Sequence, residues 1–147
     1  MKNKNRTLTL SLAFTTIFAI ALVILTLGAP WIVEFLCEFF HRDYLAKFLT
    51  VVTYLAVPAG WGAIILLYKI LLNVDKGNVF EEENVKYLSI LSWLCIYVGV
   101  LSGFASLRFT MFIIISISAL FIGLIVRVVR NIISKAIEIK EENDMTV

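Results

Sequence analysis

The segment "TMFIIISISALFIGLIV", from Thr110 to Val126, contains no charged side chain and no regular alternation of polar and apolar residues. A strand of a membrane barrel would show that alternation. A helix crosses a hydrocarbon core of about 30 Å with about 20 mainly apolar residues. Because lipid offers no hydrogen-bond partners, the backbone must satisfy its own polar groups, as a helix does. The segment therefore predicts a membrane-spanning helix.

Three further runs of the chain share this character. Uncharged residues occupy positions 7–33, 48–68, 87–107 and 109–126, which are 27, 21, 21 and 18 residues long. Hydrophobic residues make up 61% of the 147 residues, against roughly 45–50% in soluble domains. We therefore predict an all-α integral membrane protein, a four-helix bundle.

The length fits one domain, so residues 1–147 are treated as a single membrane domain. Its spans are expected at about residues 8–33, 48–72, 85–107 and 109–130, with a loop at 73–84 and a C-terminal helix and tail at 127–147. The first run is interpreted as a retained helix, because the apolar region of a signal peptide is usually only about 7–15 residues long.

Basic residues are divided unevenly between the two predicted sides of the membrane. The side with both termini and the 73–84 loop carries ten Lys and Arg residues, and the other side carries three. The ten are Lys2, Lys4, Arg6, Lys69, Lys76, Lys86, Arg127, Arg130, Lys135 and Lys140, and the three are Arg42, Lys47 and Arg108. Basic residues favour the cytoplasmic side. We therefore expect a multi-pass membrane protein with both termini and the loop in the cytoplasm.

The fourth helix is expected to continue into the cytoplasm as far as about Glu141, because no Gly or Pro interrupts the sequence there. Its predicted apolar stripe consists of Val128, Val129, Ile132, Ile133, Ala136 and Ile137, with Arg130, Ser134, Lys135 and Glu138 opposite. The final residues, 143–147, are expected to fray.

Small residues mark close helix packing in the third and fourth spans. Gly99 and Gly103 form a GxxxG pair, and Ala119 and Gly123 repeat the small-xxx-small spacing. Such residues let helix backbones approach closely. The partner is expected within the same chain, and a homo-oligomer is the alternative. In the second span, Pro58 removes a backbone hydrogen bond and predicts a kink. That kink is interpreted as part of a bent packing helix, with a transport hinge as the alternative.

The sequence shows no catalytic or metal-binding motif. Its one histidine, His41, lies near Glu38 and Asp43, and a solvated loop explains this group better than a metal site does. The cores of the four spans hold no Asp, Glu, Lys, Arg or His, although such residues inside the membrane mark proton relays and ion paths. The chain is therefore not expected to be an enzyme or to bind a cofactor or a metal. Its net charge of +2 gives no reason to expect direct nucleic-acid binding.

The segment "KGNVFEEENVKYL", from Lys76 to Leu88, separates the second and third spans. Gly77 predicts the C-cap of the second helix. Glu81, Glu82 and Glu83 are expected in the first turn of the third helix, where carboxylates complement the positive helix end.

The longer stretch "LLNVDKGNVFEEENVKYLSILSWL", from Leu71 to Leu94, resembles an uncharacterised bacterial family of four-span membrane proteins, domain-of-unknown-function family 2975. That family shows a KG-x-x-F-[TS]-x-EN-V-x-x-LR-x-I pattern, and the C-terminal "AIEIKEENDMTV" looks like its usual ending. The pattern matches Lys76, Gly77, Phe80, Glu83, Asn84, Val85 and Leu88. Two positions depart from it. Glu81 stands where the family has Thr or Ser, and Ser89 stands where the family has Arg.

The resemblance implies a four-helix inner-membrane protein without established activity. Members look to be paired with a small helix-turn-helix regulator, which implies a cytoplasmic regulator as partner. The interaction candidates are Gly77, Phe80, Glu83, Asn84 and Leu88. Two other hypotheses remain open. One is a small oligomeric transport or permeability component acting through the kinked second helix, and the other is an immunity-type protein against a membrane-active peptide, acting through His41–Asp43.

Overall fold

A computed structural model describes residues 2–146 of the chain, with side chains from Arg6 onward. Its elements are α1 (Lys2–Phe39), a short 3₁₀ turn η1 (Asp43–Leu45), α2 (Ala46–Asp75), α3 (Glu82–Ser106) and α4 (Phe112–Met145). The described residues contain no strand, so the all-α prediction is confirmed. Four helices are long and apolar enough to cross a membrane, which indicates a multi-pass membrane protein.

The helix bounds differ from the predicted spans. α1 continues through Pro30 to Phe39, and α4 begins at Phe112, three residues later than expected. α4 also remains helical to Met145, so the expected end near Glu141 is wrong, whereas the expected fraying of the final residues stays a prediction. The Thr146 hydroxyl lies within hydrogen-bond distance of the carbonyl oxygens of Glu142 (3.2 Å) and Asn143 (3.0 Å), and these contacts satisfy the last turn. Val147 lies outside the described residues.

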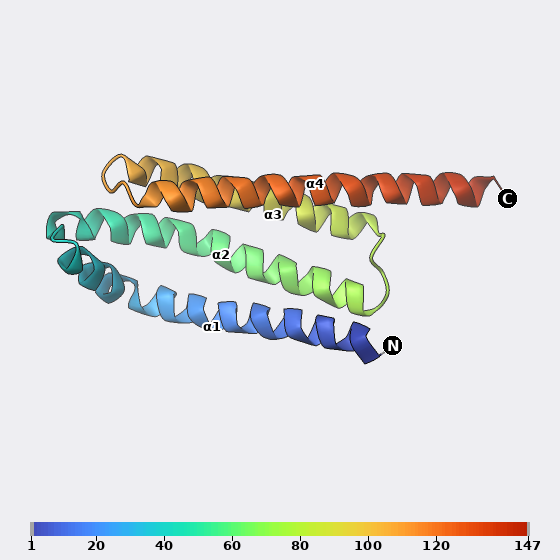
Figure 1. Cartoon of the computed structure of the whole chain (residues 1–147), viewed down its shortest axis with the longest axis horizontal. Coiled ribbons are helices and arrows are strands. Elements are labelled where there is room, and N and C mark those ends of the chain that lie inside the picture. The colour runs from blue at the N-terminus through green and yellow to red at the C-terminus, as the bar shows by residue number, and fades with distance from the viewer. Residues whose placement is uncertain (1, 147) are drawn as a thin grey trace.

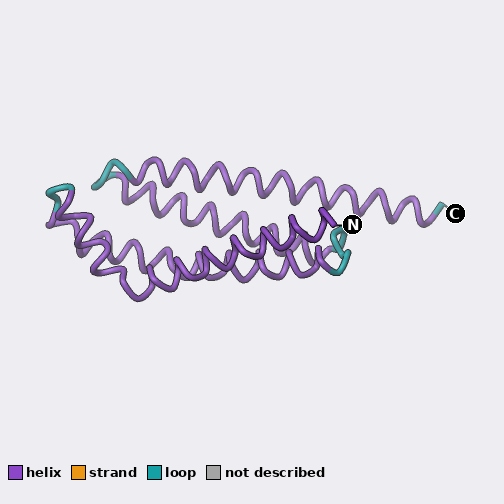
Figure 2. Tube along the Cα trace, turned by 60° about the horizontal axis from the view of Figure 1, so that its bottom comes forward, coloured by secondary structure: helices purple, strands orange, loops and turns teal. Residues whose placement is uncertain are grey.

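The helices pack in series, in the order of the chain. Within residues 2–146, helix backbones approach one another closely only between α1 and α2, α2 and α3, and α3 and α4. Figure 1 shows this order from α1 at the lower edge to the adjacent pair α3 and α4 at the upper edge. The second view, in Figure 2, shows the same long antiparallel helices joined by short loops. The fold is therefore an open helical bundle.

The two ends of the bundle differ. Both termini and the α2–α3 loop lie at one end, here called the termini end, and the two other connections lie at the opposite turn end (Figure 1). α4 has 34 residues, so at 1.5 Å per residue it is about 51 Å long. It projects past the ends of the other helices at the termini end (Figure 1).

The turn end contains the best-buried apolar cluster. Val33 and Cys37 of α1 pack with Leu45 and Leu49, and Phe109 and Phe112 cover them. The rings of Phe40 and Phe109 also meet edge to face, with centroids 5.6 Å apart. These side chains join α1 to the start of α4, although the two helices are not packed along their lengths.

His41 ends α1 in a left-handed conformation, with a φ of 54°. The Arg42 N–H donates to the Cys37 carbonyl at 2.7 Å, and the His41 N–H donates to the Glu38 carbonyl at 3.0 Å. These two bonds make a Schellman motif, in which the left-handed residue is usually Gly. The only histidine of the chain therefore has a role in terminating a helix. Within the described part of the chain, no three His, Cys, Asp or Glu side chains are grouped as metal ligands would be.

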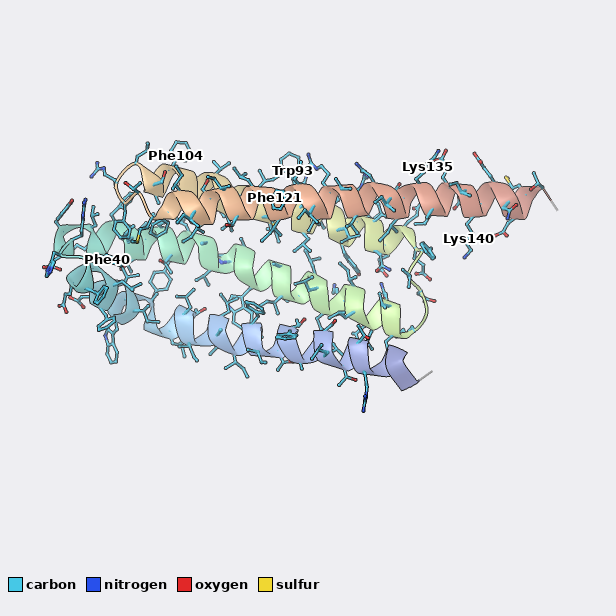
Figure 3. The ribbon with its side chains drawn as sticks, in the orientation of Figure 1. Phe40, Trp93, Phe104, Phe121, Lys135 and Lys140 are labelled. Carbon is cyan, nitrogen blue, oxygen red and sulfur yellow. The ribbon has the colours of Figure 1, made fainter. Side chains whose placement is uncertain are left out.

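Large apolar side chains cover the outer faces of the helices. Trp93 and Phe104 point away from the bundle at its upper edge in Figure 3, and Phe121 is exposed as well. Several polar side chains are instead buried, among them Ser92, Ser102 and Ser116. This distribution is the reverse of a soluble protein and fits a bundle whose surroundings are hydrocarbon.

Candidate functional site

The α3–α4 interface contains a reciprocal pair of hydrogen bonds. The Ser92 hydroxyl of α3 donates to the Gly123 carbonyl of α4 at 2.9 Å. The Ser116 hydroxyl of α4 donates to the Gly99 carbonyl of α3 at 2.7 Å. In both helices the serine precedes the glycine by seven residues, so the antiparallel arrangement pairs each serine with the opposite glycine. These bonds fix the register of the two helices.

Glycines make that close approach possible. A Cβ atom at Gly99 would lie 2.6 Å from the Cγ atom and 3.2 Å from the backbone nitrogen of Leu120. A Cβ atom at Gly123 would lie 3.1 Å from the Cβ atom of Cys95. One at Gly103 would lie 3.2 Å from a side-chain oxygen of α4. The GxxxG face of α3 therefore packs on α4 of the same chain, next to Gly123.

Ala119 and Pro58 are two further sequence candidates, one on α4 and one in α2. Ala119 is half-buried on α4. Pro58 is exposed, and α2 runs unbroken through it from Ala46 to Asp75. Near the proline, the Tyr97 hydroxyl of α3 donates to the Leu55 carbonyl of α2 at 3.1 Å. This bond ties α3 to the turn of α2 where proline weakens the backbone ladder.

The loop at the termini end begins with a second Schellman motif. Gly77 has a φ of 82°, its N–H donates to the Val74 carbonyl at 3.1 Å, and the Asn78 N–H donates to the Asn73 carbonyl at 2.9 Å. Glycine is the residue that adopts this conformation without strain. The C-cap residue itself is Lys76, and Gly77 follows it. The part of the loop outside helices is residues 76–81, which is shorter than the predicted 73–84.

Asn84 holds this loop in place. Its side chain is 1% exposed and donates to the carbonyls of Asn78 at 2.8 Å and Val79 at 3.0 Å. Its Oδ1 atom accepts from the Asn73 side chain of α2 at 2.8 Å. One side chain thus satisfies two loop carbonyls and connects the end of α2 to the start of α3.

The glutamate run is divided between the N-cap and the first turn of α3. The expectation that all three glutamates occupy the first turn is wrong for Glu81, which is the N-cap residue and makes no side-chain capping bond. Glu82 and Glu83 are in the first turn. A Glu83 carboxylate oxygen accepts from the Tyr87 hydroxyl at 2.7 Å. Leu88, one turn further on, is buried.

Phe80 is different from the other motif residues. Gly77 and Asn84 shape the loop, Leu88 packs inside, and Glu83 is hydrogen-bonded, whereas the Phe80 side chain is 51% exposed. Phe80 is therefore the interaction candidate that exposes a large aromatic side chain on the loop.

The part of α4 from Arg127 to Met145, here called the α4 extension, presents a different face from the one predicted. Ile137 is buried and Ile133 and Ala136 are half-buried, but Val128, Val129 and Ile132 are exposed, so the predicted stripe is divided between two faces. Arg130 and Ser134, which were expected opposite the stripe, are half-buried on the side of α3. The serine–glycine pairs turn the face of α4 that holds Ser116 and Gly123 toward α3. This orientation decides which side of the extension is buried.

The start of α3 and the α4 extension share one depression of about 330 Å³. It is lined by Glu82, Val85 and Lys86 of α3 and by Arg130, Ser134, Ile137, Glu138 and Glu141 of α4. The start of α3 and the extension of α4 therefore form one continuous surface at the termini end. Within it, three carboxylates and two basic groups are close together.

A family model described as "Protein of unknown function (DUF2975)" matches residues 18–147. The chain belongs to this family. The match covers most of α1 and all of the other helices, including the loop motif. A comparison with curated proteins found no match, and neither did a comparison with solved structures. Membership in DUF2975 therefore brings no assigned activity to this chain.

Proposed function

We propose that this DUF2975 protein is a non-enzymatic protein of a bacterial plasma membrane, and that its cytoplasmic face binds a cytosolic helix-turn-helix regulator. In this proposal the termini end is cytoplasmic. The protein itself does not contact DNA. It holds the regulator at the membrane, and changes in that attachment alter transcription.

The observation that carries the proposal is the exposure of Phe80. The neighbouring motif residues have structural roles, but the ring of Phe80 stands on a loop that Asn84 keeps rigid. An exposed aromatic residue on a preformed loop is a good anchor for a protein partner, because little conformational entropy is lost on binding.

The α4 extension supplies the rest of the surface. Ile132 is 62% exposed, and Ile139 is also exposed further along the helix. Both residues lie toward the C-terminal end of α4. This end of the helix projects past the other helices, and Figure 3 labels Lys140 there. An apolar helix face with charged neighbours fits the groove of a partner protein. Glu81 and Glu82, exposed beside Phe80, favour a partner with basic side chains.

Site-specific photocrosslinking in living cells tests this proposal. Phe80 is replaced by a photoreactive phenylalanine derivative, and Phe39 is replaced in a matched control. Phe39 is 69% exposed but lies at the turn end. The expected result is a crosslink from position 80 to a cytosolic DNA-binding protein, with no such product from position 39.

Two further variants locate the contact. Glu81→Lys combined with Glu82→Lys, and separately a chain ending at Ile137, should each weaken the crosslink and change the transcripts that the captured regulator controls. Glu83 is left intact because Tyr87 depends on it. Crosslinks from position 80 to lipid alone, or unchanged transcripts in both variants, would exclude the proposed role.

A further inference from the structure

A small polar pocket lies between α3 and α4, close to the level where the last uncharged run ends. It has a volume of about 300 Å³ and is lined by Ser89, Ser92, Arg127, Arg130 and Asn131. All five residues are polar, although apolar side chains surround the same helices immediately toward the turn end. This group is called the arginine pocket.

The two arginines lack acidic partners. Among the side chains that the structure describes, from Arg6 to Thr146, the only ion pair joins Lys135 to Glu138, so neither Arg127 nor Arg130 has a carboxylate of these residues within 4.0 Å. The Nε atom of Arg130 is buried and has no hydrogen-bond partner in this part of the chain. Its Nη1 atom donates to the Asn131 side chain at 3.0 Å. A buried, unpaired guanidinium N–H is costly unless a ligand accepts from it.

The second arginine is held by an aromatic ring. The guanidinium carbon of Arg127 lies 4.9 Å from the centroid of the Trp93 ring. Trp93 is exposed on the outer face of α3 (Figure 3). Tryptophan is enriched at the level of lipid headgroups. Arg127 is also the first charged residue after the 109–126 run, so the arginine pocket lies at the depth where phospholipid phosphates are found.

We propose that the arginine pocket binds a phosphate group, and that its occupant is the headgroup of an anionic phospholipid at the termini end. Guanidinium groups match phosphate oxygens with paired hydrogen bonds. Basic pockets between membrane helices are suited to anionic headgroups. One buried water needs only about 10–15 Å³ of such a cavity, so the pocket of about 300 Å³ has room for a phosphate together with part of its glycerol.

The surroundings support one phosphate rather than a larger anionic ligand. Glu82, Glu138 and Glu141 line the adjoining depression on the other side of Arg130, and Lys86 is there too. These carboxylates disfavour a second negative group beyond the arginine pocket. Ser89, which stands where the DUF2975 pattern has Arg, contributes to the lining without filling the space with a third guanidinium.

The test uses the full chain in neutral detergent and measures the affinity of three probes. The probes are phosphatidylglycerol, phosphatidylcholine and inorganic phosphate, and binding is followed by native mass spectrometry and by the shift of thermal unfolding. Wild-type protein should bind phosphatidylglycerol more tightly than phosphatidylcholine. Arg130→Gln and Arg127→Gln should each weaken phosphatidylglycerol binding about fivefold to tenfold.

Lys140→Gln is the matched control, because it removes one positive charge from α4 outside the arginine pocket. It should leave the affinity unchanged. Competition by millimolar inorganic phosphate would assign the pocket to a soluble phosphate ligand and overturn the lipid assignment. Equal binding of phosphatidylglycerol by wild type and both folded arginine variants, or an equal loss in Lys140→Gln, would overturn the phosphate site altogether.

Discussion

Replacing Gly99 by Ala tests the closest helix contact in the molecule. The new Cβ atom would lie 2.6 Å from the Cγ atom of Leu120, and ordinary contacts begin near 3.4 Å. The backbone nitrogen of Leu120 would be only 3.2 Å away, so rotation of the leucine side chain alone does not relieve the clash. α3 and α4 must separate, and separation stretches the hydrogen bond from Ser116 to the Gly99 carbonyl.

The expected cost follows from three terms. Overpacking a tight interface costs about 1–3 kcal/mol, and a hydrogen bond between membrane helices contributes about 0.6 kcal/mol. Alanine is a better helix former than glycine by at most about 1 kcal/mol, which offsets part of the loss. We expect Gly99→Ala to lower the free energy of unfolding by about 2 kcal/mol, which raises the unfolded-to-folded ratio about thirtyfold.

The assay is reversible unfolding in mixed micelles by increasing sodium dodecyl sulfate, followed by tryptophan fluorescence. The control is Gly28→Ala, because a Cβ atom there would meet only the side chain of Ile32, four residues along α1. Equal unfolding midpoints for Gly99→Ala, Gly28→Ala and wild type would refute the close approach. A change in oligomeric state without a change in unfolding would instead place the Gly99 contact between chains.

Four smaller changes test the loops and the hydrogen bonds. His41→Gly should raise the free energy of unfolding by about 1 kcal/mol in the same assay, because glycine adopts the left-handed conformation without strain. Gly77→Ala should lower it by about 1 kcal/mol for the opposite reason. Asn84→Ala should cost about 1–3 kcal/mol by leaving two loop carbonyls without their donor, and limited proteolysis should show faster cleavage within residues 76–81. Ser116→Ala should cost about 0.6 kcal/mol and at most about 1.7, and a loss well above that range would show a larger role for this hydroxyl.

The number and type of the helices could be predicted because the signal is strong and local. An uncharged run of about 20 residues has few structural alternatives in lipid, and all four runs became helices. Gly77 was also predictable, since a glycine at the end of an apolar run commonly terminates a helix. Helix ends were less predictable because capping depends on individual contacts, such as those of Thr146 and His41.

The orientation of α4 about its axis could not be obtained from its apolar pattern alone. Membrane helices are apolar on most sides, so the pattern beyond Val128 gives a weak indication of the inner face. The contacts of Ser92 and Ser116 decide it instead. A signal was present in the sequence, because a serine stands seven residues before a glycine in both α3 and α4. The arginine pocket depends on that same register, so the sequence alone does not identify it.

Packing in series has a consequence for how the chain is made. Because each helix lies along its neighbours in the chain, α1 and α2 can associate while α3 is still being synthesised. α3 and α4, joined by a turn of only a few residues, can then pair as soon as both leave the ribosome and enter the bilayer. Contacts between neighbours in sequence form quickly, and segments that leave the ribosome first fold first. Insertion and assembly can therefore proceed together, from the first helix to the last.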